Sequence, residues 1–249
     1  MSKQIIDFQD LGMRPYRDTW DYQEELLREN VAIKTRLREL GDLPGDHSEE
    51  MKALQTRHHL LFVEHPPVFT LGKSGDPANV LMSEENLKAL GIEFYNTNRG
   101  GDITFHGPEQ LVGYPILDLE KFYTDIGRYL RNIEQVVIDT LAEYGITGQR
   151  SAGETGVWID PEKKGRERKI CAIGVRSSRW VTMHGFALNV NTNLDYFNMI
   201  IPCGIQGKQV TSMAKELKRP VEMSEVKFKL LQHFSRIFEA EFRSVPAEA

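Results

Sequence analysis

The sequence is poor in cysteine and in long apolar runs. It has two cysteines, Cys171 and Cys203, in 249 residues, so a disulfide framework is excluded and a zinc site would need histidines at ligand spacing. The histidines show no such spacing, which argues against a metal site. No stretch approaches the ~18 consecutive apolar residues of a membrane span, and the N-terminus lacks the basic and apolar regions of a signal peptide. We therefore expect a cytoplasmic protein that acts away from membranes and holds no metal.

The chain also lacks an excess of positive charge. Its net charge is −5 at pH 7, which argues against a nucleic-acid partner because neutralising phosphates requires a basic surface. Hydrophobic residues make up 40% and charged residues 27%, as in an ordinary globular protein. We expect one domain over residues 1–249, with its core at about 55–240 and an N-terminal region, 1–54, made of a helix and a loop.

Apolar spacing predicts both helices and strands. The clearest helix is 124–144, where Ile126, Leu130, Ile133, Val137 and Leu141 recur at helical spacing. Further helices are expected at 21–40, 83–90, 212–217 and 224–238, strands at 59–64, 68–71, 92–97, 103–105, 111–118, 156–159, 169–175 and 186–190, and an exposed loop or hairpin at 160–168. Because helices and strands occur in mixed order without regular alternation, the pattern favours an α+β fold over a doubly wound sheet.

Arg99-Gly100-Gly101 begins the first of three segments with residue types that are unusual for a purely structural role. The glycine pair lets the backbone approach a ligand closely or adopt a positive φ. Arg99 and His106 flank the short strand that follows. A tight turn leading into a strand explains the same residues equally well, so both interpretations stay open.

Lys169 opens the second segment, a strand of mainly small and apolar residues. A lysine at a strand end is more often a solvated charge, and the charged run Arg166-Glu167-Arg168 before it favours that interpretation. Cys171, in the same strand, is typical of a small buried hydrophobic residue.

Cys203 lies in the third segment, Pro202-Cys203-Gly204, which reads as a turn. A free cysteine is most often buried and inert. The flanking glycine leaves this sulfur approachable, however, and a nearby ammonium such as that of Lys169 would favour the reactive thiolate. The residue types make Cys203 a candidate nucleophile, but spacing alone cannot bring it next to Lys169.

Five segments in order resemble the signature blocks of the octanoyl-(acyl carrier protein):protein N-octanoyltransferases, also called lipoyl(octanoyl) transferases. The blocks lie between about residues 55 and 215 and are His65-Pro66-Pro67-Val68-Phe69-Thr70-Leu71-Gly72, residues 99–108, residues 169–174, Met183-His184-Gly185-Phe186-Ala187-Leu188-Asn189-Val190 and Pro202-Cys203-Gly204-Ile205. The resemblance implies the fold of biotin and lipoate protein ligase catalytic domains, a mixed and mainly antiparallel sheet with packed helices.

The same resemblance implies an activity. Members of this family take an octanoyl group from octanoyl-acyl carrier protein, hold it as a cysteine thioester, and pass it to a lysine of lipoyl domains. The acceptors would be the lipoyl domains of 2-oxoacid dehydrogenases and the glycine cleavage H protein, and no cofactor is implied. A lipoyl domain with an acidic surface would need a local basic patch, for which Arg166, Arg168, Arg176 and Arg179 are candidates, although a solvated loop is the default explanation.

The resemblance also assigns roles to single residues. Cys203 corresponds to the acyl-thioester cysteine and Lys169 to the lysine that lowers the pKa of that thiol. Contacts to the substrate fall on Arg99, Gly100, Gly101, Asp102, Ile103, Thr104, Phe105, His106, Ala172, Ile173, Gly174, Gly185, Phe186 and Ala187. The oxyanion of each step needs backbone N–H donors, and the segments 100–101 and 172–174 are the candidates. Cys171 stands where a residue such as alanine is usual.

Three other functions are weighed against this one. An ATP-dependent lipoate-protein ligase would share the fold, but it activates a free acid and needs no thiol nucleophile. A non-catalytic protein that binds lipoyl domains would dispense with Lys169 and Cys203. A cysteine hydrolase would use His106 or His184 as its base and release free octanoate.

Overall fold

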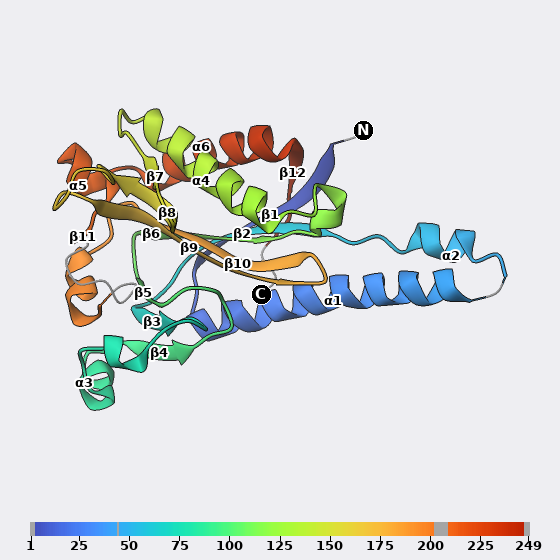
Figure 1. The fold of residues 1–249 in the computed structure, drawn as a ribbon, viewed down its shortest axis with the longest axis horizontal. Helices are drawn as coiled ribbons and strands as arrows, with labels where there is room; N and C mark the ends of the chain where they lie inside the picture. The colour runs from blue at the N-terminus through green and yellow to red at the C-terminus, as the bar shows by residue number, and fades with distance from the viewer. Residues whose placement is uncertain (1–2, 44, 202–208, 247–249) are drawn as a thin grey trace.

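Two sheets form the centre of the molecule. The computed structural model describes residues 3–43, 45–201 and 209–246 (Figure 1). The main sheet runs in the order β12-β1-β2-β6-β10-β9-β8-β7, with β11 added to β9, and the small sheet in the order β4-β3-β5. Their bounds are β1 (Gln4–Met13), β2 (His58–Glu64), β3 (Val68–Leu71), β4 (Glu93–Asn96), β5 (Ile103–His106), β6 (Gln110–Ile116), β7 (Gln149–Ser151), β8 (Glu154–Ile159), β9 (Arg168–Ser178), β10 (Val181–Asn189), β11 (Gln209–Val210) and β12 (Ala240–Ser244).

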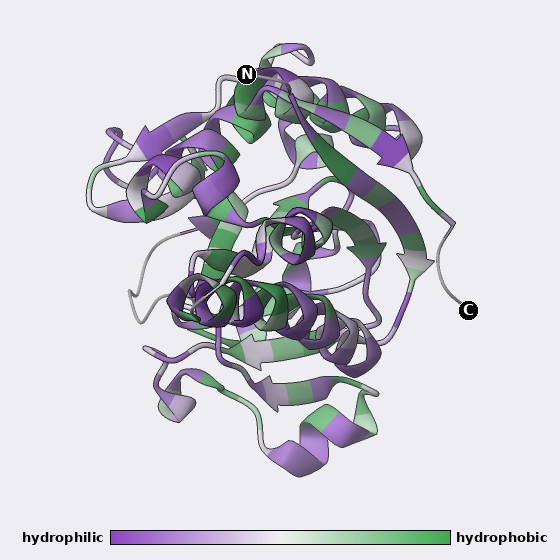
Figure 2. Cartoon of the chain, turned by 90° about the vertical axis from the view of Figure 1, so that its right-hand side faces the viewer, coloured by the Kyte–Doolittle hydropathy of each residue, from purple (hydrophilic) through white to green (hydrophobic). Residues whose placement is uncertain are grey.

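Helices cover the main sheet on both faces. Helices α4 and α6 pack on one face, and α1 crosses the other face next to the small sheet (Figure 1). The bounds are α1 (Tyr16–Asp42), α2 (Ser48–Ala53), α3 (Glu84–Ala89), α4 (Ile126–Ala142), α5 (Met213–Leu217) and α6 (Met223–Phe238), with 3₁₀ turns at η1 (Pro77–Asn79), η2 (Leu119–Lys121) and η3 (Leu194–Met199). The helices carry hydrophilic residues beside hydrophobic ones (Figure 2), as expected where only one face of a helix is buried.

The apolar residues separate into three clusters that match these layers. Ile133 and Val137 of α4 join Leu230 and Phe234 of α6 in the first cluster, against the main sheet. The second cluster joins α1 to the opposite face of the sheet through Leu26, Leu27, Leu61, Val63, Val112, Tyr114, Ile116, Val181, Met183 and Ala187. The third lies around the small sheet and contains Phe69, Leu71, Leu87, Ile92, Ile103, Phe105, Phe197 and Ile200.

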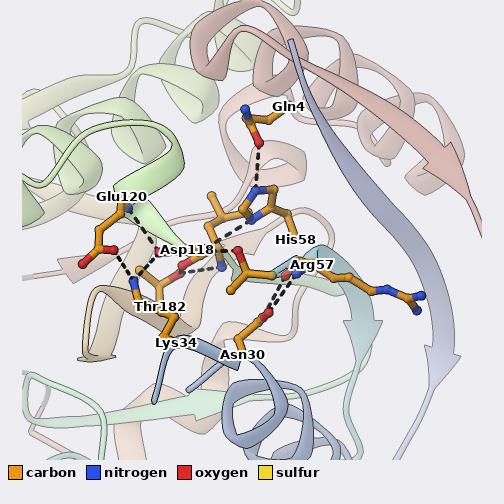
Figure 3. A network of polar contacts seen from close by, with 10 residues as sticks. Gln4, Asn30, Lys34, Arg57, His58, Asp118, Glu120 and Thr182 are labelled. Carbon is orange, nitrogen blue, oxygen red and sulfur yellow. Dashed lines mark hydrogen bonds and ion pairs between the residues drawn. The ribbon is translucent and has the colours of Figure 1, made fainter. Parts of the chain in front are cut away.

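A buried polar network fastens α1 to the main sheet (Figure 3). The Asp118 carboxylate binds the Lys34 ammonium at 2.6 Å and accepts a hydrogen bond from Thr56 at 2.9 Å. The Asp118 N–H donates to His58 Nδ1, so the proton of His58 is on Nε2, which donates to Gln4. Burial lowers the pKa of His58 to about 4, so the ring is neutral near pH 7. The charge of Asp118 is therefore balanced by Lys34 and not by His58.

The predicted fold class is confirmed, since the main sheet is mixed and mainly antiparallel. The predicted helices are present, and the first begins at Tyr16, five residues before its predicted start. The N-terminal region holds more than the expected helix and loop, because β1 lies inside the main sheet, parallel to both β2 and β12, and α2 follows the loop. No helix in the described ranges is long and apolar enough to cross a membrane.

Candidate active site

A cavity of about 620 Å³ brings the predicted substrate-contact residues together. Its wall is formed by β5, β6, β9 and β10, by the loop before β5, and by Tyr16 from the first turn of α1. The predicted residues that line it are Arg99, Gly100, Gly101, Asp102, Ile103, Thr104, His106, Ala172, Ile173, Gly174, Gly185, Phe186 and Ala187, and Lys169 lines it as well. Segments from residue 16 to residue 187 therefore share one site.

Phe105 is the predicted contact residue that does not line this cavity. Its side chain is only 1% exposed, and its ring stacks on Tyr196 at a centroid distance of 4.5 Å and packs against Phe69 and Phe197. Successive side chains of a strand point to opposite faces, so Thr104 and His106 reach the cavity from one face of β5 while Phe105 packs in the apolar cluster of the small sheet. Ile103, at the start of the strand, belongs to the same cluster and also borders the cavity.

Several residues of the wall were not predicted. Gln110, Val112 and Tyr114 occupy alternate positions of β6 and all line the cavity. Every residue of this strand is buried, so its sequence has no polar–apolar alternation that could have identified them. Tyr16 has no local signal, because it reaches the cavity only through the packing of α1. It is 1% exposed and stacks on His106 at 5.8 Å with ring planes 10° apart.

Arg99 is held inside the molecule by backbone and side-chain oxygens. It is 7% exposed, and its Nη2 donates to the Thr70 carbonyl at 2.6 Å and to the Thr70 hydroxyl at 2.9 Å. The next N–H, that of Gly100, donates to the Val175 carbonyl at 2.9 Å. This N–H is therefore occupied and is not an oxyanion donor, contrary to the expectation for residue 100.

The glycines of this loop allow two backbones to approach each other. A Cβ on Gly174 would lie 2.8 Å from the Gly100 carbonyl oxygen, and Gly101 has a φ of +85°. Any larger residue at 174 would push the loop away from β9, because such a contact is far closer than normal packing allows. The glycine pattern thus has a structural reason at this point, the packing of the Arg99 loop on β9.

His106 is a neutral, buried hydrogen-bond donor. Its Nδ1 lies 2.9 Å from the Gln110 amide oxygen, while the Gln110 amide nitrogen donates to Phe105 and Asn189. This orientation of the amide places the histidine proton on Nδ1. Burial first, then the charges of His65 and Arg99, lower the pKa of His106 well below its usual value. The ring is therefore uncharged near neutral pH.

His184 is fixed in a similar way by three other residues. Its Nε2 donates to Asn98 at 2.7 Å, and Asn98 donates to Glu24 at 2.7 Å. The Arg176 guanidinium binds the same Glu24 oxygen at 2.6 Å. Burial lowers the pKa of His184 to about 3. With both rings buried and hydrogen-bonded, neither His106 nor His184 has the near-neutral pKa of a general base, which disfavours the hydrolase alternative.

Lys169 is half-buried on β9, at the edge where β11 pairs with that strand. Its ammonium lies 4.6 Å from the ring centre of Trp158, within the range of a cation–π interaction. The chain of Lys169 passes Gly156, where a Cβ would lie 3.5 Å from the lysine Cε and 2.6 Å from the Cys171 carbonyl oxygen. Gly156 also has a φ of +124°, so glycine is required here for two independent reasons.

Glu134 holds Gly156 from the helix side. Its buried carboxylate accepts from the Gly156 N–H at 3.0 Å and binds the guanidinium groups of Arg131 and Arg150 at 2.7 and 2.9 Å. A buried carboxylate is stable only when its charge is paired and its oxygens are hydrogen-bonded. This arrangement connects α4 to the part of β8 that adjoins Lys169.

The two cysteines differ in what the structure shows of them. Cys171 is fully buried, and burial raises the pKa of its thiol far above the usual value, so it is not suited to act as a nucleophile. Cys203 lies outside the described residues. The described chain on either side of 202–208 borders the cavity, which Phe197 lines on one side and Val210 on the other. Val210 pairs with Lys169 in the sheet.

The expected basic patch is divided by ion pairs. Arg168 binds Asp160 and Glu216, and Arg176 binds Glu24. Arg179 donates to Thr35 of α1. Arg176 and Arg179 therefore belong to the α1 side of the sheet, and the four arginines do not form one surface.

The fold and the cavity define the class of protein. Residues 15–235 match the family model of the lipoyl protein ligase A/B catalytic domain. Among solved structures, the bipartite lipoate protein ligase of Thermoplasma acidophilum has a TM-score of 0.65 at 18% identity, covering 100% of this chain and 88% of that one. A lipoate-protein ligase A bound with ATP has a TM-score of 0.64 at 18% identity, covering 100% and 90%. These two likenesses show the fold.

Sequence relatives specify the family further. The octanoyltransferase of Christiangramia forsetii is 54% identical over 244 residues, covering 98% of this chain and 99% of that protein. The octanoyltransferase of Flavobacterium johnsoniae is 57% identical over 239 residues, covering 95% and 97%. The chain therefore belongs to the octanoyltransferases of the lipoyl protein ligase A/B family, and it is an acyltransferase. The family match begins at residue 15, so α1 is part of the family's structure.

Proposed function

We propose that the protein transfers an octanoyl group from octanoyl-acyl carrier protein to a specific lysine of lipoyl domains, through a thioester on Cys203. The acceptors would be the lipoyl domains of 2-oxoacid dehydrogenases and the glycine cleavage H protein. The observation that carries the proposal is the position of Lys169. It lines the cavity and pairs with Val210, at the edge of the segment that contains Cys203.

In the first half-reaction the Cys203 thiolate attacks the thioester carbonyl of the donor. A new thioester forms on Cys203 and the carrier thiol leaves, so one thioester replaces another at little cost in free energy. The Lys169 ammonium favours the thiolate over the thiol by charge proximity. Because the transfer has two steps, the donor protein and the acceptor domain bind the enzyme one after the other and need not be bound at the same time.

In the second half-reaction the amine of the acceptor lysine attacks the Cys203 thioester. An amide forms, the Cys203 thiolate leaves, and the amine loses a proton. In this proposal Lys169 gives its proton to the departing carrier thiol in the first half-reaction, and as a neutral amine it takes the proton of the attacking nitrogen in the second. The ammonium that results stabilises the departing Cys203 thiolate, whereas His106 and His184 have pKa values well below the working range. The apolar part of the wall binds the acyl tail, and each buried methylene contributes about 0.8 kcal/mol.

The test is the mass of the intact protein after incubation with octanoyl-acyl carrier protein, without acceptor and without ATP. We expect one octanoyl adduct on the unmutated protein and on Cys171→Ala, and none on Cys203→Ala. An adduct that persists in Cys203→Ala would reject Cys203 as the nucleophile. Transfer that requires ATP and free octanoate would instead identify a ligase of the same fold.

A further inference from the structure

A positively charged surface lies at the Lys169 end of the cavity. It is formed by Lys164 and Arg166 of the β8–β9 turn and by Lys215, Lys218 and Arg219 in and after α5, all of them exposed. We call these five residues the basic rim, and we propose that it binds the acceptor domain through acidic side chains around the target lysine. This proposal rests on the proposed function and names the surface that recognises the second substrate.

The local charge is opposite to that of the whole chain. Residues 160–169 and 213–219 contain eight basic and four acidic residues, a net charge of +4, whereas the chain as a whole has −5. Of the four acidic residues, Asp160 and Glu216 are paired with Arg168. None of the five residues of the basic rim has an ion-pair partner within the described ranges.

The two parts of the basic rim are held side by side by Arg168. Its guanidinium binds Glu216 of α5 through two hydrogen bonds of 2.7 Å and Asp160 at the end of β8 through a third of 2.9 Å. The turn is itself ordered by backbone hydrogen bonds from Lys163 to Asp160 and from Arg166 to Lys163. Figure 1 shows α5, β11 and the β8–β9 turn at one end of the molecule. A fixed arrangement of charges costs little entropy when it binds a partner.

The position of the basic rim favours the acceptor over the donor. Arg168 precedes Lys169 directly in β9, and Gln209 and Val210 of β11 pair with these two residues, so the β8–β9 turn and α5, which carry the basic rim, adjoin the part of β9 that holds Lys169. A lysine side chain has only four methylenes, so the acceptor domain has to approach Lys169 closely. A thioester carried on a longer prosthetic arm can be delivered from a greater distance. Complementary charge at such a surface mainly accelerates association.

Charge reversal tests the proposal. The double variants Lys164→Glu/Arg166→Glu and Lys215→Glu/Lys218→Glu change exposed residues only, and Arg57→Glu/Lys121→Glu is the matched control, since both of its residues are exposed and line a different cavity. We expect KM for the acceptor domain to rise about tenfold at low ionic strength in the two rim variants, with kcat unchanged, and this difference to vanish at high salt. The control keeps the KM of the unmutated protein.

Two measurements separate the proposal from the function on which it rests. Acylation by octanoyl-acyl carrier protein should proceed at the same rate in all variants, and a loss confined to this step would assign the basic rim to the donor and overturn the proposal. Equal KM values in rim and control variants would overturn it as well. If the unmutated protein forms no octanoyl adduct, the proposed function fails. Direct titration with the acceptor domain then still decides whether the basic rim binds it.

Discussion

The two ends of the cavity hold their polar groups in different ways. At one end, His106 and His184 are buried, and each donates its ring proton to a side-chain amide whose orientation is fixed by further hydrogen bonds. At the other end, Lys169 is half-buried, lies over the Trp158 ring and adjoins a charged surface. This difference suggests that the two ends have different roles. The histidine end shapes the cavity with neutral groups, and the proposed function assigns the chemistry to the Lys169 end.

Among the substitutions at the two ends, Lys169→Ala should have the largest effect on the rate of transfer. Loss of the group that favours the thiolate and relays the proton should slow transfer by about 10² to 10⁴-fold, with little change in the midpoint of thermal unfolding because Lys169 is only half-buried. Single-turnover formation of the octanoyl adduct measures the effect. Lys163→Ala, a nearby exposed lysine of the β8–β9 turn, is the control and should retain full activity. A rate for Lys169→Ala within threefold of the unmutated protein would contradict its proposed role.

The histidine end should make stability depend on pH. His65 packs against His106 at a ring-centre distance of 5.9 Å. Burial lowers the pKa of His65 to about 4 and that of His184 to about 3, against about 6.5 in an unfolded chain. Between the two values the unfolded state binds more protons, so the free energy of unfolding is highest above pH 6.5 and falls as the pH is lowered. Each ring accounts for a loss of about 3 kcal/mol between pH 7 and pH 4.

Urea unfolding at pH 7, 6 and 5 measures this loss. His184→Gln should lower stability at pH 7, because its contacts to Asn98 and to the Trp20 ring change, but it should flatten the dependence on pH. A variant with the same slope as the unmutated protein would show that His184 is not the titrating group.

Gly156→Ala tests how strongly transfer depends on the position of Lys169. The new Cβ would lie 2.6 Å from the Cys171 carbonyl oxygen, at a φ of +124°, so we expect a loss of about 1–3 kcal/mol in stability. Because relief of this contact has to shift Cys171 and with it the start of β9, where Lys169 lies two residues away, transfer should also slow by roughly tenfold, as a small displacement of a group at the reacting centre does.

Gly153→Ala is the control for strain alone. Gly153 also has a positive φ, +77°, but has open space around it, so its substitution should cost about 1 kcal/mol without an effect on transfer. Equal activity losses in the two variants would show that backbone strain, and not the position of Lys169, is responsible.

The sequence predicted the positions of helices and strands along the chain better than it predicted which of them pack together. The spacing of apolar residues identified the helices and most strands, because it depends on local burial. It could not place β1 between β12 and β2, since that pairing joins residues more than 200 positions apart in the sequence. Motif blocks located most of the cavity wall, but a contiguous block ignores the alternation of a strand and so included Phe105. Tyr16 and the Glu24–Asn98–His184 connection arise from tertiary packing and leave no local pattern.

Cys171→Ala should have the smallest effect and completes the comparison between the two ends. Cys171 lies two residues after Lys169 on β9, yet it is fully buried and its thiol is held neutral. Removal of its sulfur leaves a small void, so we expect a loss of about 1 kcal/mol in stability and an unchanged rate of adduct formation. The expected indifference follows from burial, because Cys171 contributes to the core cluster and does not line the cavity, whereas Lys169 does. Loss of the adduct in Cys171→Ala with its retention in Cys203→Ala would reverse the assignment of the nucleophile and, with it, the role given to the Lys169 end.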